Sequence, residues 1–184
     1  EQVELNEKKF DYQEEQANND ETQASVEVDD NYEKEQPNEI LKERWREILR
    51  EIPVSVNNMY GDPVIQWKDT IEKLDTLAES KHRGPVGIIM KGKLDPEKVE
   101  DLRSRHEAGL RIVNLVSISE LGDIEKVGHE HRYENLLQLT EAGVPAIAYI
   151  RPLMPPLNTD EATLTKMLDG IADSGCKNIV VSGF

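Results

Sequence analysis

Small and polar residues follow each of five apolar stretches in this sequence, and their types suit the binding of a small polar ligand. They are Asn57 to Pro63 after the first stretch, Lys91 and Gly92 after the second, Ser117 and Ser119 on the third, Arg151 and Pro152 after the fourth, and Ser182 and Gly183 on the fifth. In parallel β/α folds the ligand lies at the carboxyl ends of the strands, so these residues would form a ring around one site. An arginine at such a mouth, Arg151, must be either paired or exposed to solvent.

Other catalytic signatures are weak. No glycine-rich phosphate loop, nucleophile elbow or paired-carboxylate motif stands out. His129 and His131 form an HxH pair without a clear third ligand, so we expect solvated loop histidines before a helix rather than a metal site. Cys176 is the single cysteine of the chain and precedes the fifth apolar stretch, at the opposite end from the ring. We expect a structural thiol there.

A repeated unit would position the ring. Each unit ends a helix and begins an apolar strand, at Ser80 to Gly84, Ala108-Gly109, Ala142-Gly143 and Ser174-Gly175. Glycine suits these joints because the residue just past a helix often needs a positive φ. Expected strand starts lie near Pro53, Val86, Arg111, Ala146 and Asn178. Their spacing of about 31 residues is the repeat of an eight-unit β/α barrel, although a doubly wound open sheet shares it.

Helical apolar spacing fills the intervals between the strands. It predicts helices over Ile40 to Arg50, Val64 to Ala78 and Arg132 to Thr140. Asp95-Pro96 supplies an N-cap and a first-turn proline for another helix, and Asn158 followed by Glu161 forms a capping-box-like start for the last one.

The net charge of −15 is concentrated at the N-terminus, where residues 1–40 hold 14 acids and 3 bases. Residues 1–37 lack periodic apolar positions, so we expect a disordered acidic segment. Alternatively, Val3, Leu5, Phe10 and Tyr12 dock as a short strand in a larger protein. From its two ends, we expect the chain to be a processed or cropped segment. We expect residues 38–184 to form one structured domain.

Composition also limits the partners. An acidic balance argues against electrostatically driven binding of nucleic acid. No apolar run reaches the roughly 18 residues of a membrane span, and the N-terminus lacks the regions of a signal peptide. With a single cysteine, these features predict a cytoplasmic protein that is not embedded in a membrane.

The residues around the ring resemble a known family. Tyr60-Gly61-Asp62-Pro63, after an apolar strand, is similar to the Gly-Gly-Glu-Pro-type element of the radical S-adenosylmethionine (radical SAM) superfamily, with Asp62 where the family usually has Glu. Two later segments are similar to the fourth helix and fifth strand of that family's core. They are residues 132–144, which begin with Arg132, and Tyr149 to Pro155 with Asn158. The resemblance covers about Ile40 to Phe184.

The resemblance implies a six-stranded partial β/α barrel, (β/α)6, in which the present strands are the second to sixth. The family's first strand leads to a CxxxCxxC loop whose thiolates hold a [4Fe-4S] cluster, and this sequence shows neither. One cysteine cannot substitute, because such a cluster needs several thiolate ligands.

The resemblance also implies that SAM is bound by residues of the ring, and catalytic residues are not identified. The implied SAM-binding residues are Tyr60, Gly61, Asp62, Pro63, Ser117, Ser119 and Arg151. Simpler interpretations stay open. The first four could form an ordinary turn, and the serines could fill a tapering barrel. Arg151 could form an ion pair with Asp62 or a neighbouring acid, and Arg132 could be an exposed helix-start residue.

By resemblance, the chain is the SAM-binding portion of a radical SAM enzyme, in which reductive cleavage of SAM yields a 5′-deoxyadenosyl radical and an electron donor is a partner. We expect this chain alone to be inactive, and its substrate is unknown.

One alternative is a non-catalytic degenerate barrel that serves as a protein-interaction module. Another is a metal-assisted β/α-barrel lyase or aldolase that uses His129 or Lys91. An open strand edge near Pro53 to Val56 should favour aggregation.

Overall fold

The computed structural model describes residues 39–57, 61–125 and 129–183. The predicted acidic segment 1–37 therefore lies outside the described residues. The chain divides into two units, Glu1–Glu43 and Arg44–Phe184, and the strands and most of the helices belong to the second.

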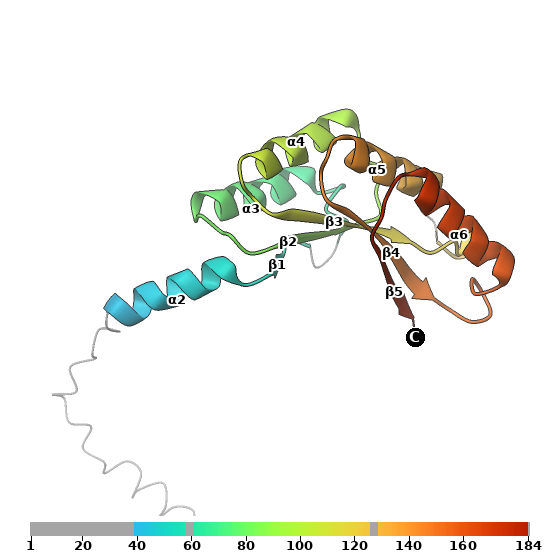
Figure 1. The fold of residues 1–184 in the computed structure, drawn as a ribbon, viewed down its shortest axis with the longest axis horizontal. Coiled ribbons are helices and arrows are strands. Elements are labelled where there is room, and N and C mark those ends of the chain that lie inside the picture. The colour runs from blue at the N-terminus through green and yellow to red at the C-terminus, as the bar shows by residue number, and fades with distance from the viewer. Residues whose placement is uncertain (1–38, 58–60, 126–128, 184) are drawn as a thin grey trace, which may run out of the picture. The chain divides into compact units, whose positions relative to one another are not determined.

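Five parallel strands form one sheet in chain order, β1-β2-β3-β4-β5 (Figure 1). They are β1 (Val54–Ser55), β2 (Val86–Met90), β3 (Ile112–Ile118), β4 (Ala146–Leu153) and β5 (Ile179–Gly183). Each strand starts within one residue of the predicted position. Consecutive neighbours that are all parallel require a crossover between every pair, and the intervening helices supply it.

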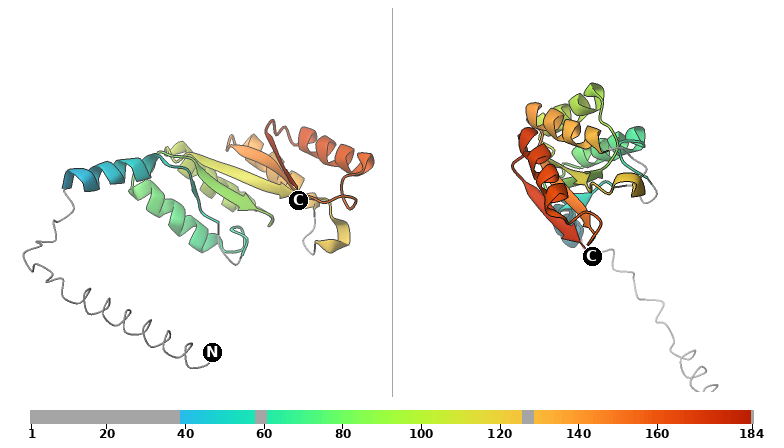
Figure 2. Two further views of the ribbon diagram at one scale, coloured as in Figure 1. Left: turned by 90° about the horizontal axis from the view of Figure 1, so that it is seen from below. Right: turned by 90° about the vertical axis from the view of Figure 1, so that its right-hand side faces the viewer.

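The helices α3 to α6 lie together on one face of the curled sheet, which leaves the other face concave (Figures 1 and 2). The helices are α2 (Glu39–Glu51), α3 (Trp67–Glu79), α4 (Pro96–Glu107), α5 (Glu130–Glu141) and α6 (Glu161–Asp173), with a 3₁₀ turn, η1 (Gly122–Ile124). This arrangement is an α/β partial barrel and confirms the predicted fold class.

The two faces of the sheet differ in burial, as side chains that alternate along a strand require. On β2, Val86, Ile88 and Met90 are fully buried under the helices, whereas Gly87 and Ile89 are partly exposed on the concave face. The same alternation runs along β3 as far as Val116, after which Ser117 and Ile118 are also buried, and along β4 as far as Ile150. The main core thus lies between the sheet and the helices.

Two predicted helix starts were wrong. Helix α3 begins at Trp67 rather than Val64, because the amides of Ile65 and Gln66 donate to the carbonyl of Asp62 in a preceding turn. Helix α6 is capped by Asp160, which accepts from the amide of Thr163, and not by Asn158. The predicted cap of α4 is confirmed, since Asp95 accepts from Lys98 ahead of Pro96.

The glycines at the helix ends have positive φ at Gly109, Gly143 and Gly175, as predicted. The first joint differs, because Lys81 takes the positive φ there. Gly84 instead allows a close approach: a Cβ at this position would lie 2.4 Å from the carbonyl oxygen of Ile52 and 2.6 Å from that of Glu51. The end of α2 is therefore packed directly against the start of β2.

Among the strands that the structure describes, β1 is at the edge of the sheet, where the open edge is predicted, and apolar side chains are exposed close to it in sequence. In α2, Trp45 is 62% exposed and Leu49 55%, and Ile52 just after the helix is 42% exposed. Among the described residues, no helix is long and apolar enough to span a membrane.

Candidate functional site

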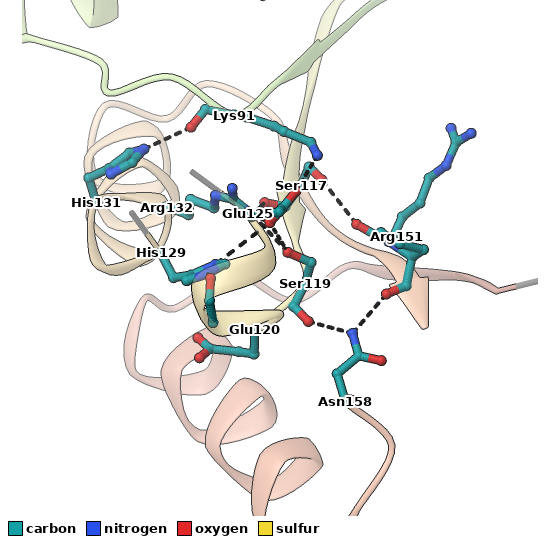
Figure 3. Close-up of polar contacts among 12 residues, drawn as sticks. Lys91, Ser117, Ser119, Glu120, Glu125, His129, His131, Arg132, Arg151 and Asn158 are labelled. Carbon is teal, nitrogen blue, oxygen red and sulfur yellow. Dashed lines mark hydrogen bonds and ion pairs between the residues drawn. The ribbon is translucent and has the colours of Figure 1, made fainter. Parts of the chain in front are cut away.

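The strand register brings the predicted ring together at the carboxyl ends of β2, β3 and β4. Ser117 pairs with Tyr149 on the concave face, and Met90 pairs with Val116, so that Lys91 follows beside Ser117. Ser119 and Arg151 come one step beyond the last paired residues of β3 and β4 on that register. Figure 3 shows Lys91, Ser117 and Ser119 around Glu125, whereas the Arg151 guanidinium is directed away from them.

The Gly61-Asp62-Pro63 turn is attached to the end of β2 through the Asp62 carboxylate. One oxygen accepts the amide of Val64 at 2.8 Å, and the other accepts the amides of Lys91 and Gly92, the latter at 3.0 Å. Gly92 permits this approach, since a Cβ there would lie 3.0 Å from that of Val64. Tyr60 lies outside the described residues.

Arg132 lies in the centre of a buried polar cluster, contrary to the alternative that it is an exposed helix-start residue. Its side chain is fully buried, and Nη1 donates to the carbonyl of Ser117 and the hydroxyl of Ser119, both at 3.1 Å. It also pairs with Glu125 at 3.0 Å. Nε and Nη2 are buried without a hydrogen-bond partner among the described residues.

Glu125, just after η1, joins this cluster to β2. Its carboxylate accepts from the Lys91 ammonium and from the Ser119 hydroxyl (Figure 3). Burial raises the pKa of the Glu125 carboxyl, but the hydrogen bonds from Lys91 and Ser119 outweigh burial. With the positive charge of Arg132 they lower this pKa from 4.5 to about 2. Glu125 is therefore a carboxylate at neutral pH.

Ser117 and Arg151 are in contact through the backbone of Arg151. The Ser117 hydroxyl donates to the Arg151 carbonyl at 3.2 Å. The guanidinium of Arg151 is exposed, donates to the Tyr149 hydroxyl at 3.2 Å, and lies 5.6 Å from the centre of that ring. The alternative ion pair between Arg151 and Asp62 is absent from the described contacts. The Asp62 oxygens accept backbone amides instead.

Asn158 holds the ends of β3 and β4 together. Its amide nitrogen donates to the carbonyls of Ser119 and Pro152, and its oxygen accepts the amide of Met154 at 2.7 Å. The side chain is fully buried. This role explains why Asn158 does not cap α6.

A second ion pair lies beside the cluster, at the residue that follows Ser119. Glu120 accepts from Tyr133 at 2.8 Å and from Lys166 at 2.6 Å. Burial raises the pKa of Glu120, but these two hydrogen bonds outweigh it and the net pKa is lowered. Burial and the bond to Glu120 raise the pKa of Tyr133. Tyr133 is therefore a neutral hydrogen-bond donor.

The histidines are not solvated loop residues, so that prediction was wrong. His131 is in the first turn of α5, and its Nε2 contacts the Lys91 carbonyl at 2.7 Å. His129 is the N-cap residue of α5, 3.8 Å from Glu125. The described residues contain no group of three His, Cys, Asp or Glu side chains that could hold a metal ion.

Cys176 has the structural surroundings predicted for it. The thiol is buried and lies 3.5 Å from the carbonyl oxygen of Ala146, at the amino end of β4. A [4Fe-4S] cluster requires several thiolates at one place, and this chain has one, remote from the ring. The residues present do not fit the cluster.

Two residues of the site were missed by sequence reasoning. Asn135 is fully buried, and its amide binds the backbone of Gly92 and Leu94 in the loop after β2. Helical spacing could have found it, because Arg132, Asn135 and Leu136 share one buried face of α5. Glu125 had no comparable signal, since it follows a short irregular turn.

Comparison with solved structures supports the partial-barrel fold. The chain is similar to three crystal structures of Streptococcus suis SuiB: the protein as such, bound to S-adenosylmethionine, and bound to precursor peptide SuiA. Each is 14% identical, with TM-scores of 0.53, 0.53 and 0.54. The match covers 77% of this chain and about a third of SuiB, 33%, 33% and 32% respectively. No protein-family model and no curated protein matches the chain.

Proposed function

We propose that the chain is the SAM-binding portion of a radical SAM enzyme. The observation that carries the proposal is the meeting of the Gly61-Asp62-Pro63 turn, Ser117 and Arg151 at one mouth of a parallel partial barrel. The fold likeness to SuiB, which has been crystallised with S-adenosylmethionine, supports it. At 14% identity that likeness concerns the fold, and SAM binding by this chain is proposed from its own residues.

The contacts of the predicted residues divide them into two groups. Arg151 has an exposed guanidinium, and a carboxylate such as that of SAM is the partner that suits it best. Ser117 donates its proton to a backbone carbonyl but keeps its acceptor lone pairs. Backbone groups around Gly61 would then bind the ligand's amino group.

Asp62 and Ser119 already have protein partners for their side chains. As SAM ligands they stay predictions, as do Tyr60 and Pro63. We infer that Asp62 acts through the backbone amides that it accepts, and Ser119 through its contacts with Glu125 and Arg132. SAM, when bound in a radical SAM enzyme, supplies the 5′-deoxyadenosyl radical. That chemistry needs a cluster and an electron donor that this chain's own residues do not provide, so no step is assigned to them.

A titration with three ligands tests the assignment. SAM and S-adenosylhomocysteine carry the amino-acid carboxylate, whereas 5′-methylthioadenosine lacks it. If Arg151 pairs with the carboxylate, R151A should weaken the binding of the first two by about tenfold, which corresponds to about 1.4 kcal/mol, and leave the third unchanged. Isothermal titration calorimetry on the full chain measures all three.

Arg111 provides the matched control, because it is also exposed but precedes β3 at the other end of the sheet. R111A should leave all three affinities unchanged. Equal weakening by both variants would mean a general charge effect. Absence of any SAM binding to the wild-type chain would remove the proposed function.

The metal-assisted lyase is not supported by a specific observation. Lys91 is paired with Glu125, His129 lies 3.8 Å from the same carboxylate, and the described residues contain no group of three side chains that could hold a metal ion. The protein-interaction module has one in its favour. The exposed Trp45 and Leu49 of α2, and the edge of β1 that no other described strand pairs with, are surfaces that a protein partner could cover. Sedimentation velocity, which measures self-association of the chain, addresses this alternative.

A further inference from the structure

Glu125 connects three elements that meet at the proposed SAM site. It contacts Lys91 after β2, Ser119 after β3 and Arg132 in α5. Its side chain is only 15% exposed, and η1 immediately precedes it. A single carboxylate thus fixes the relative placement of two strand ends.

Lys91 depends on this contact for its position. Its side chain is 42% exposed, and Glu125 is the only described residue with which its ammonium forms an ion pair or hydrogen bond. Four rotatable bonds leave an unpaired lysine side chain with many conformations. Without Glu125 the ammonium would therefore adopt many positions in the solvent.

Ser119 and Arg132 depend on Glu125 in a different way. The Ser119 hydroxyl donates to Glu125 and accepts from Arg132, so the carboxylate sets the direction of that hydroxyl (Figure 3). Arg132 in turn donates to the carbonyl of Ser117. The chain of contacts therefore runs from Glu125 to the strand end that carries the proposed ligand-binding serine.

We propose that Glu125 is a positioning residue of the SAM site, which holds the Lys91 ammonium and the Ser117 to Ser119 segment in the arrangement that receives the ligand. The inference rests on the proposed function. Glu125 does not itself contact SAM in this scheme. The lowered pKa of Glu125 agrees with this role, because the carboxylate is charged at neutral pH.

Chemical labelling of lysines measures the first part of the proposal without any ligand. The full chain is treated with a limiting amount of acetic anhydride, and the acetylation of Lys91 relative to Lys93 is read by mass spectrometry. Lys93 pairs with Glu134 at 3.2 Å and is 63% exposed, so it is an internal reference. E125Q should raise the relative labelling of Lys91 about fivefold, and E125D should raise it less because it keeps the charge.

E134Q is the matched control. It should raise the labelling of Lys93 and leave the rate at Lys91 unchanged. Circular dichroism at the labelling temperature identifies any variant that has unfolded, and E125D is the fallback if E125Q does. Unchanged labelling of Lys91 in a folded E125Q would overturn the proposal.

Calorimetric titration with SAM measures the second part. E125Q should weaken binding about tenfold, E125D should recover part of that loss, and E134Q should bind like the wild type. If the wild type and E125Q bind SAM equally, Glu125 has only a structural role and the inference is wrong while the proposed function stands. If the wild type does not bind SAM, the proposed function itself fails, and the inference with it.

Discussion

Replacing Arg132 with methionine removes the central donor of the buried cluster while keeping a side chain of similar length. Nη1 makes three contacts of 3.0 to 3.1 Å, and one of them is the ion pair with Glu125. Breaking a buried ion pair by removing one partner costs about 3–5 kcal/mol. Because Glu125 retains Lys91 and Ser119, we expect R132M to lower the free energy of unfolding by about 3 kcal/mol, near the lower limit.

Urea unfolding followed by circular dichroism measures this loss, and R105M is the comparison. Arg105 makes two contacts with Asp75, at 2.7 and 3.1 Å, but the pair is more exposed, so its loss should cost about 1 kcal/mol. The double variant R132M/E125M should be more stable than the sum of the single losses predicts, since both charges are then gone. Equal costs for R132M and R105M, or strict additivity, would refute the buried-cluster reasoning.

Three further predictions follow from the structure. Because the folded-state pKa of Glu125 is lowered from 4.5 to about 2, its contribution to stability is present above about pH 4.5 and is lost as the pH falls toward 2. In urea titrations across this pH window, the wild type should lose on the order of 2 kcal/mol more of its free energy of unfolding than E125Q. Parallel losses in the two proteins would contradict this prediction. G84A should lower the free energy of unfolding by more than about 2 kcal/mol, because its Cβ would meet backbone oxygens. G109A should cost roughly 1–2 kcal/mol, because residue 109 has a φ of +107° but no atom within 4 Å of the added Cβ. Thermal unfolding of both variants measures these losses, and the reverse order would be inconsistent with the packing. The β1 edge, which is unpaired among the described residues, and the exposed Trp45 should make the chain self-associate, and W45E should reduce this. A monodisperse monomer in sedimentation velocity would count against both the open edge and the interaction-module alternative.

The sequence was sufficient for the sheet because its signals are local and repeated. Apolar strands such as Val86–Met90 and glycine joints such as Ala142-Gly143 indicate βα units independently of one another, and every strand began where expected. The helix starts were less predictable. Asp62 and Asn158 have side chains that hydrogen-bond the backbone in several ways, and contacts distant in sequence decided which one formed.

The site was predictable as a location and less so as a set of contacts. The carboxyl ends of parallel strands placed Lys91, Ser117 and Arg151 in one region. The partners of Arg132 and the role of Glu125 depend on how α5 and η1 pack against β3, and pattern reasoning does not reach such contacts. The signal that the sequence did contain is the helical spacing that places Arg132 on the same face of α5 as Leu136 and Leu139.

The central claim is that SAM binds on the concave face, at the carboxyl ends of the strands. Methyl NMR with ¹³C-labelled isoleucines tests it directly, because Ile89 faces the concave side near the carboxyl end of β2, whereas Ile147 faces the same side at the amino end of β4, and Ile88 and Ile112 are buried under the helices. We predict that added SAM shifts Ile89 saturably and leaves the other three nearly unmoved. No saturable shift, or shifts confined to Ile147 and the buried pair, would contradict the account.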